Sequence, residues 1–234
     1  MINMRYLGIV AAVAVCLAVS ATAQAITYTW DFSNAADYYT VNAVVTAGTP
    51  GSAYVASLAP EEDEASVLAK INTQAYHLGV GDILGGGFTV SGMNNPGAVY
   101  GSLYLSPTGG GGSTVLILLS PMSSTGSGGA YEYTFDLDTN ADVRTRTPPG
   151  DWSAYNSETS GTFANAIGWI NTNGYGSNYA AFWGPQIGMS GTYGTTFTVS
   201  QIDLNVVPEP VTMAGLALGI GSIAGYVRRR RRAA

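Results

Sequence analysis

Oxygen-bearing side chains recur at every second position in one short polar segment of the chain. They are Asp136, Asp138, Asn140 and Asp142. Calcium prefers carboxylate and amide oxygens, and alternate spacing of this kind is typical of the loops that bind it. Ala141 stands where such a loop needs glycine, and Thr147 stands where a bidentate glutamate should follow. The segment is therefore a candidate calcium site, but a strand end followed by an Asx turn explains it better.

Aromatic and amide side chains gather between residues 152 and 193. Sugars are held by aromatic faces together with amide hydrogen bonds, so this composition suits a carbohydrate-binding face. Its candidate contacts are Trp152, Tyr155 and Trp183. The alternative is that these aromatic residues belong to the core, as the apolar pattern of residues 163–169 indicates.

Most metal and nucleophile chemistry is excluded by a single histidine, His77, and a single cysteine, Cys16. Zinc sites, iron–sulfur clusters and disulfides each need at least two such residues. No Gly-x-Ser-x-Gly segment accompanies His77, so a serine-type triad has no support. A glycosidase needs only two carboxylates, but no local arrangement of acids indicates one. We therefore assign no catalytic residue and expect a protein that is not an enzyme.

The charge balance limits the partners further. Only 10% of the 234 residues are charged, whereas globular domains average about 25%. Residues 26–207 contain three bases, Lys70, Arg144 and Arg146, against fourteen acids, which gives them a formal charge of −11. A nucleic-acid partner needs a basic surface to neutralise phosphates, so we expect none. The partners that this charge favours are cations or neutral polymers.

The N-terminal segment, residues 1–25, predicts a secretory signal peptide. Arg5 precedes an apolar run over residues 7–19, which is too short as a helix to cross a bilayer. Small residues then occupy the positions that a signal peptidase recognises, namely Ala21, Ala23 and Ala25. Cleavage is expected after Ala23 or Ala25, and the alternative is an uncleaved anchor. The secretion machinery and signal peptidase are thus expected partners.

The C-terminal segment, residues 207–234, has three parts in strict order. Pro208, Glu209 and Pro210 come first, an apolar stretch over residues 211–227 follows, and a basic cluster ends the segment. The cluster consists of Arg228, Arg229, Arg230, Arg231 and Arg232. The apolar stretch is marginally long enough for a transmembrane helix, and the arginines favour the cytoplasmic side. These features alone predict a short single-span anchor with the body outside.

This order of Pro-Glu-Pro, short apolar helix and terminal arginine cluster resembles the PEP-CTERM sorting signal of bacteria that make extracellular polysaccharide. The resemblance covers only the tail and concerns sorting, because members of the family have widely different bodies. It implies that an exosortase recognises residues 208–210 and processes the tail. The membrane helix would then be a transient anchor, and the inner-membrane form an intermediate on the way to the cell surface or extracellular matrix.

The body between the N-terminal and C-terminal segments, residues 26–206, is predicted to be mainly β. Alternating patterns predict strands at 26–32, 39–46, 86–91, 98–105, 114–120, 131–138, 162–171, 178–183 and 192–207. Clusters of Gly, Ser and Pro separate them. The segment 113–120 is apolar at nearly every position and predicts a central strand covered on both faces. Residues 60–70, which begin with Pro60 and four acids, predict one short helix. The regular spacing favours an antiparallel β-sandwich or jelly roll.

These observations predict an exported, non-enzymatic protein of the cell surface or extracellular matrix, with a structural or adhesive role in exopolysaccharide or biofilm. Extracellular polysaccharide is its expected partner there. The alternative is a lectin-like carbohydrate-binding module, and a glycoside hydrolase is a more remote one. No cofactor is expected apart from the candidate calcium.

Overall fold

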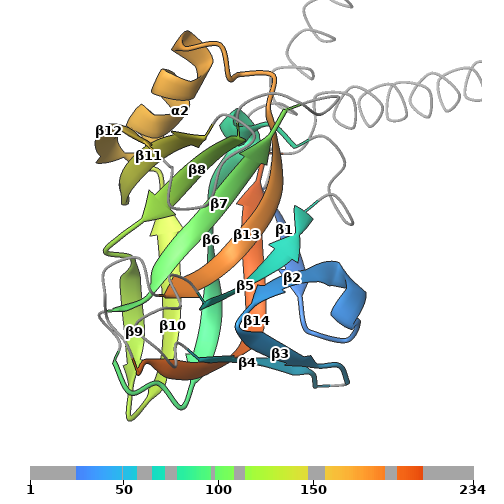
Figure 1. Cartoon of the computed structure of the whole chain (residues 1–234). Coiled ribbons are helices and arrows are strands. Elements are labelled where there is room, and N and C mark those ends of the chain that lie inside the picture. Colours follow the sequence, from blue (N-terminus) through green and yellow to red (C-terminus); the bar gives the residue numbers. More distant parts are fainter. Residues whose placement is uncertain are drawn as a thin grey trace, which may run out of the picture. The chain divides into compact units, whose positions relative to one another are not determined.

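A computed structural model describes residues 25–48, 50–56, 65–71, 78–95, 98–107, 114–146, 156–187 and 194–207 (Figure 1). The predicted signal peptide, the sorting motif, the tail helix and the arginine cluster lie outside these residues, apart from Ala25 and Val207. Residues Thr27–Val206 form one compact unit. Among the described residues, no helix is long and apolar enough to span a bilayer.

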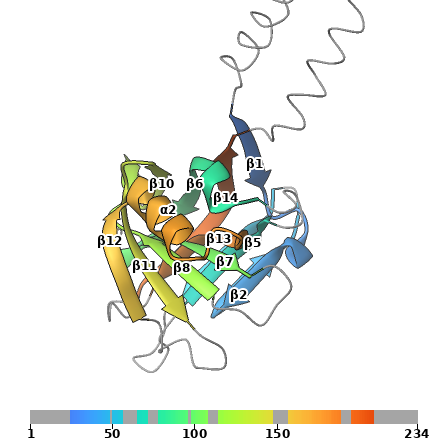
Figure 2. The same ribbon diagram turned by 90° about the horizontal axis from the view of Figure 1, so that it is seen from above.

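In the described residues, the body forms two antiparallel sheets of seven strands each, which pack face to face. Sheet A has the order β3-β4-β14-β6-β10-β9, with β1 paired to β14. Its strands are β1 (Ile26–Trp30), β3 (Ala43–Thr46), β4 (Ser52–Ala56), β6 (Ile83–Ser91), β9 (Ser123–Ser127), β10 (Ala130–Asp136) and β14 (Thr196–Val206). The first and last strands of the body are therefore neighbours, as Figure 2 shows.

Sheet B has the order β12-β11-β8-β7-β13-β5-β2. Its strands are β2 (Tyr38–Val41), β5 (Ala65–Lys70), β7 (Tyr100–Ser106), β8 (Thr114–Leu119), β11 (Asn140–Arg146), β12 (Asn156–Thr162) and β13 (Tyr179–Ile187). Two short 3-10 helices, η1 (Ala35–Asp37) and η3 (Val80–Asp82), join strands. The predicted antiparallel β-sandwich is thus confirmed.

The core lies between the two sheets and is rich in aromatic rings. Trp183 is fully buried there, with ring centroids 4.7 Å from Phe135 and 6.0 Å from Phe88. Strand β8 lies centrally in sheet B, as predicted: Val115, Ile117 and Leu119 enter the core, while Leu116 and Leu118 are buried on the opposite face. An apolar run without alternation therefore does mark a strand covered on both sides.

The predicted strand at residues 162–171 is wrong, because these residues form the helix α2 (Phe163–Thr172). Phe163, Ala166 and Ile170 are its buried residues, and their spacing has the helical rather than the strand period. Thr162 caps the helix by accepting a hydrogen bond from the backbone N–H of Asn165. The helix covers one end of the sandwich (Figure 2). There the ring of Phe163 meets that of Phe135 edge to face, with centroids 5.3 Å apart.

The predicted helix at residues 60–70 is also wrong over its described part, since Ala65–Lys70 form strand β5. Ala65, Val67 and Ala69 point into the core, and β5 pairs with β13 on one side and β2 on the other. Pairing on both edges and burial outweigh the helical preference of this segment. Residues 60–64 lie outside the described residues.

Most of the other predicted strands match observed ones, with shifts of a few residues at their ends. Among the described residues, five strands were not predicted as strands: β4, β5, β9, β11 and β12. Strands β9 and β12 occupy sheet edges and consist of small polar residues, so they lack the apolar alternation that predicts a strand.

Candidate functional site

The outer face of sheet B, the face turned away from the core, combines polar and aromatic side chains. Alternation decides which residues lie there, because their strand neighbours belong to the core. Strand pairing places Asn140 opposite Ser120 and Tyr100 opposite Gln186. It also places Asp142, Leu118 and Ser102 side by side on three neighbouring strands. Strands far apart in the sequence thus contribute to one continuous surface.

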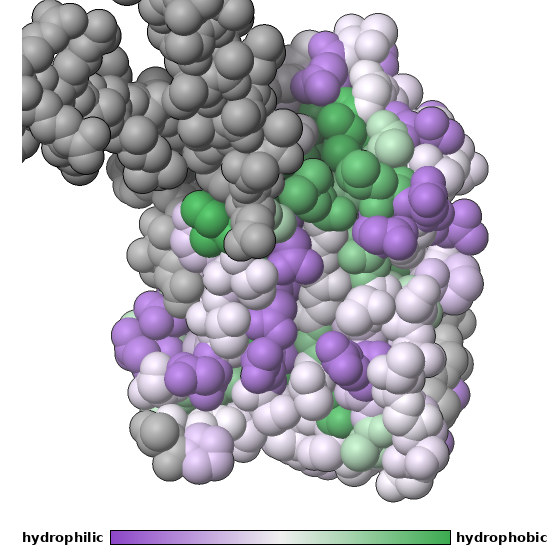
Figure 3. Space-filling view, turned by 180° about the vertical axis from the view of Figure 1, so that it is seen from behind, coloured by the Kyte–Doolittle hydropathy of each residue, from purple (hydrophilic) through white to green (hydrophobic). Residues whose placement is uncertain are grey.

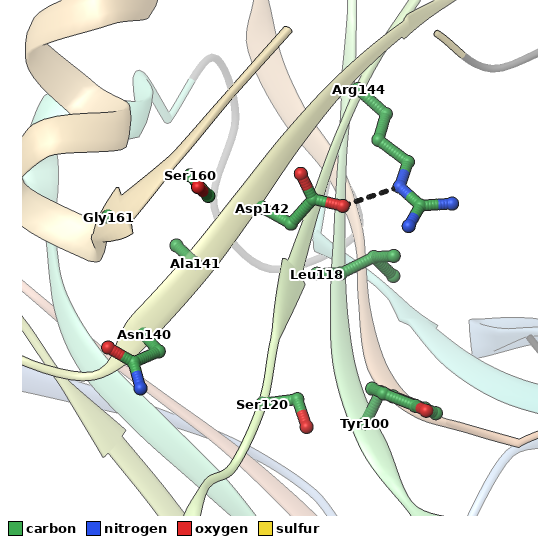
Figure 4. Close-up of a pocket in the computed structure, with 9 residues that line it drawn as sticks. All are labelled: Tyr100, Leu118, Ser120, Asn140, Ala141, Asp142, Arg144, Ser160 and Gly161. Carbon is green, nitrogen blue, oxygen red and sulfur yellow. Dashed lines mark hydrogen bonds and ion pairs between the residues drawn. The ribbon is translucent and has the colours of Figure 1, made fainter. Parts of the chain in front are cut away.

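A pocket of about 420 Å³ opens on this face, within the range of roughly 300–1,000 Å³ that is usual for small-molecule sites. We call it the sheet B pocket. It is lined by Tyr100, Leu118, Ser120, Asn140, Ala141, Asp142, Arg144, Ser160 and Gly161 (Figure 4). The lining comes from β7, β8, β11 and β12 and from the residue that follows β8, so the position of the pocket is set by regular sheet rather than by long loops.

An ion pair forms one wall of the sheet B pocket. Arg144 Nε donates to Asp142 Oδ2 at 2.7 Å, and the two side chains are 30% and 28% exposed. Ser157 Oγ donates to the other carboxylate oxygen, Asp142 Oδ1, at 2.8 Å. Both oxygens of Asp142 therefore have partners, which holds the carboxylate and the guanidinium in fixed orientations.

Several polar groups of the pocket make no side-chain hydrogen bond to any part of the chain that the structure describes. They belong to Tyr100, Ser120, Asn140 and Ser160. Hydroxyl and amide groups of this kind donate and accept hydrogen bonds equally well. Together with the ring of Tyr100 they provide what a sugar needs: one flat apolar surface and several convergent polar partners.

A buried polar network joins β7 to β13 on the same face as Tyr100. Gln186 Oε1 accepts a hydrogen bond from the Ser102 hydroxyl and a second, of 3.2 Å, from the Tyr104 hydroxyl. Gln186 and Ser102 are both almost inaccessible to solvent. Because Gln186 pairs directly with Tyr100 across β13 and β7, the network holds the backbone beneath the Tyr100 ring.

A second hollow, of about 290 Å³, lies on the outer face of sheet A. Sheet A lies behind sheet B in Figure 1, so Figure 3 views the body from this side. Residues of intermediate hydropathy cover most of this face, and the largest group of hydrophobic residues lies in its upper part. Gly87 is required there by packing, since a Cβ atom on it would lie 2.4 Å from the Tyr133 carbonyl oxygen. Asp203 accepts hydrogen bonds from Thr29 and Gln201 on its two oxygens. Strand packing explains both features, and we assign this hollow no ligand.

The structure corrects one of the predicted glycan contacts. Trp183 is fully buried, and its indole N–H donates to the Asp203 carbonyl oxygen at 3.0 Å. It belongs to the core and cannot stack on a sugar from solvent. Trp152 and Tyr155 lie outside the described residues. Sequence reasoning missed Tyr100, although its alternation with Ser102 and Tyr104 in a predicted strand places all three on one face.

The candidate calcium ligands are not brought together. Asp136 ends β10 in sheet A, whereas Asn140 and Asp142 lie on β11 in sheet B, because the chain crosses between the sheets at this turn. Asp136 Oδ1 accepts from the Asp138 N–H at 3.0 Å and from Thr139 Oγ1 at 3.1 Å, which is an Asx turn. Among the described residues, no group of three or more acidic, His or Cys side chains is placed to hold a metal ion. The turn interpretation is the one that the geometry supports.

Comparisons with known proteins give only distant likenesses. No protein-family model and no curated protein matches the chain. A protein of unknown function from Shewanella oneidensis MR-1 aligns with a TM-score of 0.32 and 13% identity, over 80% of this chain and 88% of that one. The Crh5 transglycosylase in complex with NAG aligns with a TM-score of 0.30 and 11% identity, over 79% of this chain and 85% of that one. Likenesses this weak have no bearing on activity or ligand.

Proposed function

We propose that this chain is an exported protein that adheres to extracellular polysaccharide through the sheet B pocket. The observation that carries the proposal is the pocket itself, in which the Tyr100 ring lies beside hydroxyl and amide groups without partners among the described residues. A surface of this kind binds sugars by stacking and hydrogen bonding, and it needs no catalytic group. The role is adhesive, and the protein is not an enzyme.

Export rests on the two terminal segments. We propose that residues 1–25 form a signal helix that is removed, and that the tail resembling a PEP-CTERM signal forms a transient membrane helix over residues 211–227. An exosortase would then process the tail at Pro208-Glu209-Pro210, and the body would reach the cell surface or the extracellular matrix. The strand connections of the body are proposed to be those of a jelly roll. This destination matches a pocket for polysaccharide, since the ligand and the protein would meet outside the cell.

The test measures binding of the purified protein to exopolysaccharide from the producing cells. Affinity electrophoresis or biolayer interferometry gives the affinity. Tyr100→Ala should weaken binding about ten-fold, because it removes the stacking surface. Tyr54→Ala is the matched control, since Tyr54 is 49% exposed on a strand of sheet A, away from the pocket. Equal binding of the wild type and Tyr100→Ala, or no binding by either, would rule the proposal out.

A further inference from the structure

The few basic residues of the body are not spread over its surface. Lys70 lies on β5, and Arg144 and Arg146 lie on β11, so all three belong to sheet B. Three acids, Glu132, Asp136 and Asp203, lie on β10 and β14 of sheet A. Sheet B also carries two acids, Asp142 on β11 and Glu158 on β12. The net charge of −11 over residues 26–207 favours cations or neutral polymers as partners, but it hides the fact that all three bases lie on one sheet.

Arg144 is held by an acid on its own strand, β11. Its Nε donates to Asp142 Oδ2 at 2.7 Å, and Asp142 is fixed in turn by the Ser157 hydroxyl. The two terminal nitrogens of the guanidinium are not the atoms that contact Asp142, and one of them points away from it (Figure 4). Within the described part of the chain they have no partner. The side chain thus presents a fixed, planar pair of donors at the wall of the sheet B pocket.

A planar pair of N–H donors matches the two oxygens of a carboxylate, which it binds with two parallel hydrogen bonds. We propose that the sheet B pocket selects an acidic sugar, with the carboxylate of a uronic acid unit bound end-on by Arg144. Asp142 then acts as a positioning residue that orients the guanidinium, while Tyr100, Ser120 and Asn140 bind the neutral part of the sugar ring. This inference rests on the proposed function and adds the chemical class of the ligand.

The net negative charge of the body does not oppose this selection under physiological conditions. At about 0.15 M salt the screening length is about 8 Å, so exposed acids on the far sheet act weakly on a ligand in the pocket. The guanidinium, which is partly buried and in direct contact with the ligand, is screened much less. A local contact rather than the overall field therefore decides the preference for charge.

The preference is tested with two polymers of the same backbone: polygalacturonate, whose carboxylates are charged, and its fully methyl-esterified form, whose ester groups are neutral. The wild-type protein should bind polygalacturonate about ten-fold or more tightly than the ester, since a hydrogen-bonded charge pair contributes more than a neutral contact. Arg144→Gln should abolish this difference. Lys70→Gln removes the same charge from another strand of the same sheet, and it should keep the difference.

The outcomes separate the inference from the proposed function. If the wild type binds both polymers equally and Arg144→Gln changes nothing, the selection of acidic sugars is wrong, while a loss of binding in Tyr100→Ala would still support adhesion. If Lys70→Gln acts as strongly as Arg144→Gln, general charge rather than the fixed guanidinium is responsible, and the inference is also wrong. Dextran sulfate, with dextran as its neutral reference, tests a sulfate in place of the carboxylate. Tighter binding of dextran sulfate than of polygalacturonate would overturn the assignment to a carboxylate. If the protein binds none of these polymers and does not bind native exopolysaccharide either, the proposed function is wrong as well.

Discussion

Thr29 Oγ1 donates a hydrogen bond of 2.6 Å to Asp203 Oδ1, which links the first strand of the body to its last. One step along the same strands, Thr27 Oγ1 donates to Asn205 Oδ1 at 2.7 Å. The spacing of these two contacts is that of an antiparallel pair. The strands that adjoin the predicted signal peptide and the predicted sorting tail are therefore bound to each other.

Loss of this link should destabilise the body. Thr29→Val keeps the shape of the side chain but removes the donor, so we expect a loss of about 1 kcal/mol in the free energy of unfolding. Urea denaturation measures it. Thr125→Val on the exposed edge strand β9 is the control, since Thr125 makes no side-chain hydrogen bond among the described residues. Equal stability of the two variants would show that the Thr29 contact contributes nothing.

Close packing against Trp183 makes Gly101 intolerant of a larger side chain. A Cβ atom there would lie 2.6 Å from the Trp183 ring and 2.8 Å from Met122 Sδ. Gly101→Ala should therefore cost about 1–3 kcal/mol of stability through overpacking. Gly168→Ala in α2 should instead gain about 0.5–1 kcal/mol, because alanine favours a helix interior, and no atom lies within 4 Å of the added carbon. Thermal unfolding should show a lower melting temperature for Gly101→Ala and a higher one for Gly168→Ala. An unchanged melting temperature of Gly101→Ala would contradict the packing described for Trp183.

Stability should fall at alkaline pH. Burial raises the pKa of Tyr133 to about 12 and that of Tyr38 to about 12, whereas a tyrosine in the unfolded chain has a pKa of about 10. The folded state thus holds protons that the unfolded state releases, so the contribution is complete below about pH 10 and is lost toward pH 12. Tyr133→Phe should reduce the slope of unfolding free energy against pH above about pH 9. An unchanged slope would contradict the role of burial.

Calcium should not stabilise the protein, because Asp136 already serves as a turn residue. Asp136→Asn keeps an oxygen that accepts both hydrogen bonds and should retain most of the stability, whereas Asp136→Ala should lose about 1 kcal/mol. A ligand that binds the folded state raises the melting temperature, so thermal unfolding with and without millimolar calcium gives the answer. A rise in melting temperature with calcium that disappears in Asp136→Ala would restore the calcium hypothesis.

The sequence predicts the layers of this fold better than the site on them. The run at residues 114–120 predicts a doubly covered strand, because only burial on both sides tolerates so many consecutive apolar residues. The helix α2 could also have been recognised from the spacing of its buried residues and from its cap at Thr162. Strand β5 could not, because its two partner strands lie far away in the sequence and decide its conformation.

The sheet B pocket depends on registers that no local pattern reveals. Tyr100, Ser120 and Asn140 come from three different segments and meet only because β7, β8 and β11 pair in one particular alignment. Ser160 lies on a polar edge strand that has no sequence signal. Asp142 was recognised as a polar candidate in the sequence, but its partner is Arg144 rather than Asp136, because the chain changes sheets between the two acids.

We propose that the body between the two terminal segments is the mature protein outside the cell. The most direct test is the intact mass of the protein recovered from its native cell surface, together with the sequence of both its ends. We expect a chain that begins at Gln24 or Ile26 and ends near Pro208-Glu209-Pro210, without the terminal arginines. A chain that retains residues 228–232 would contradict the account, since the protein would then remain anchored in the membrane.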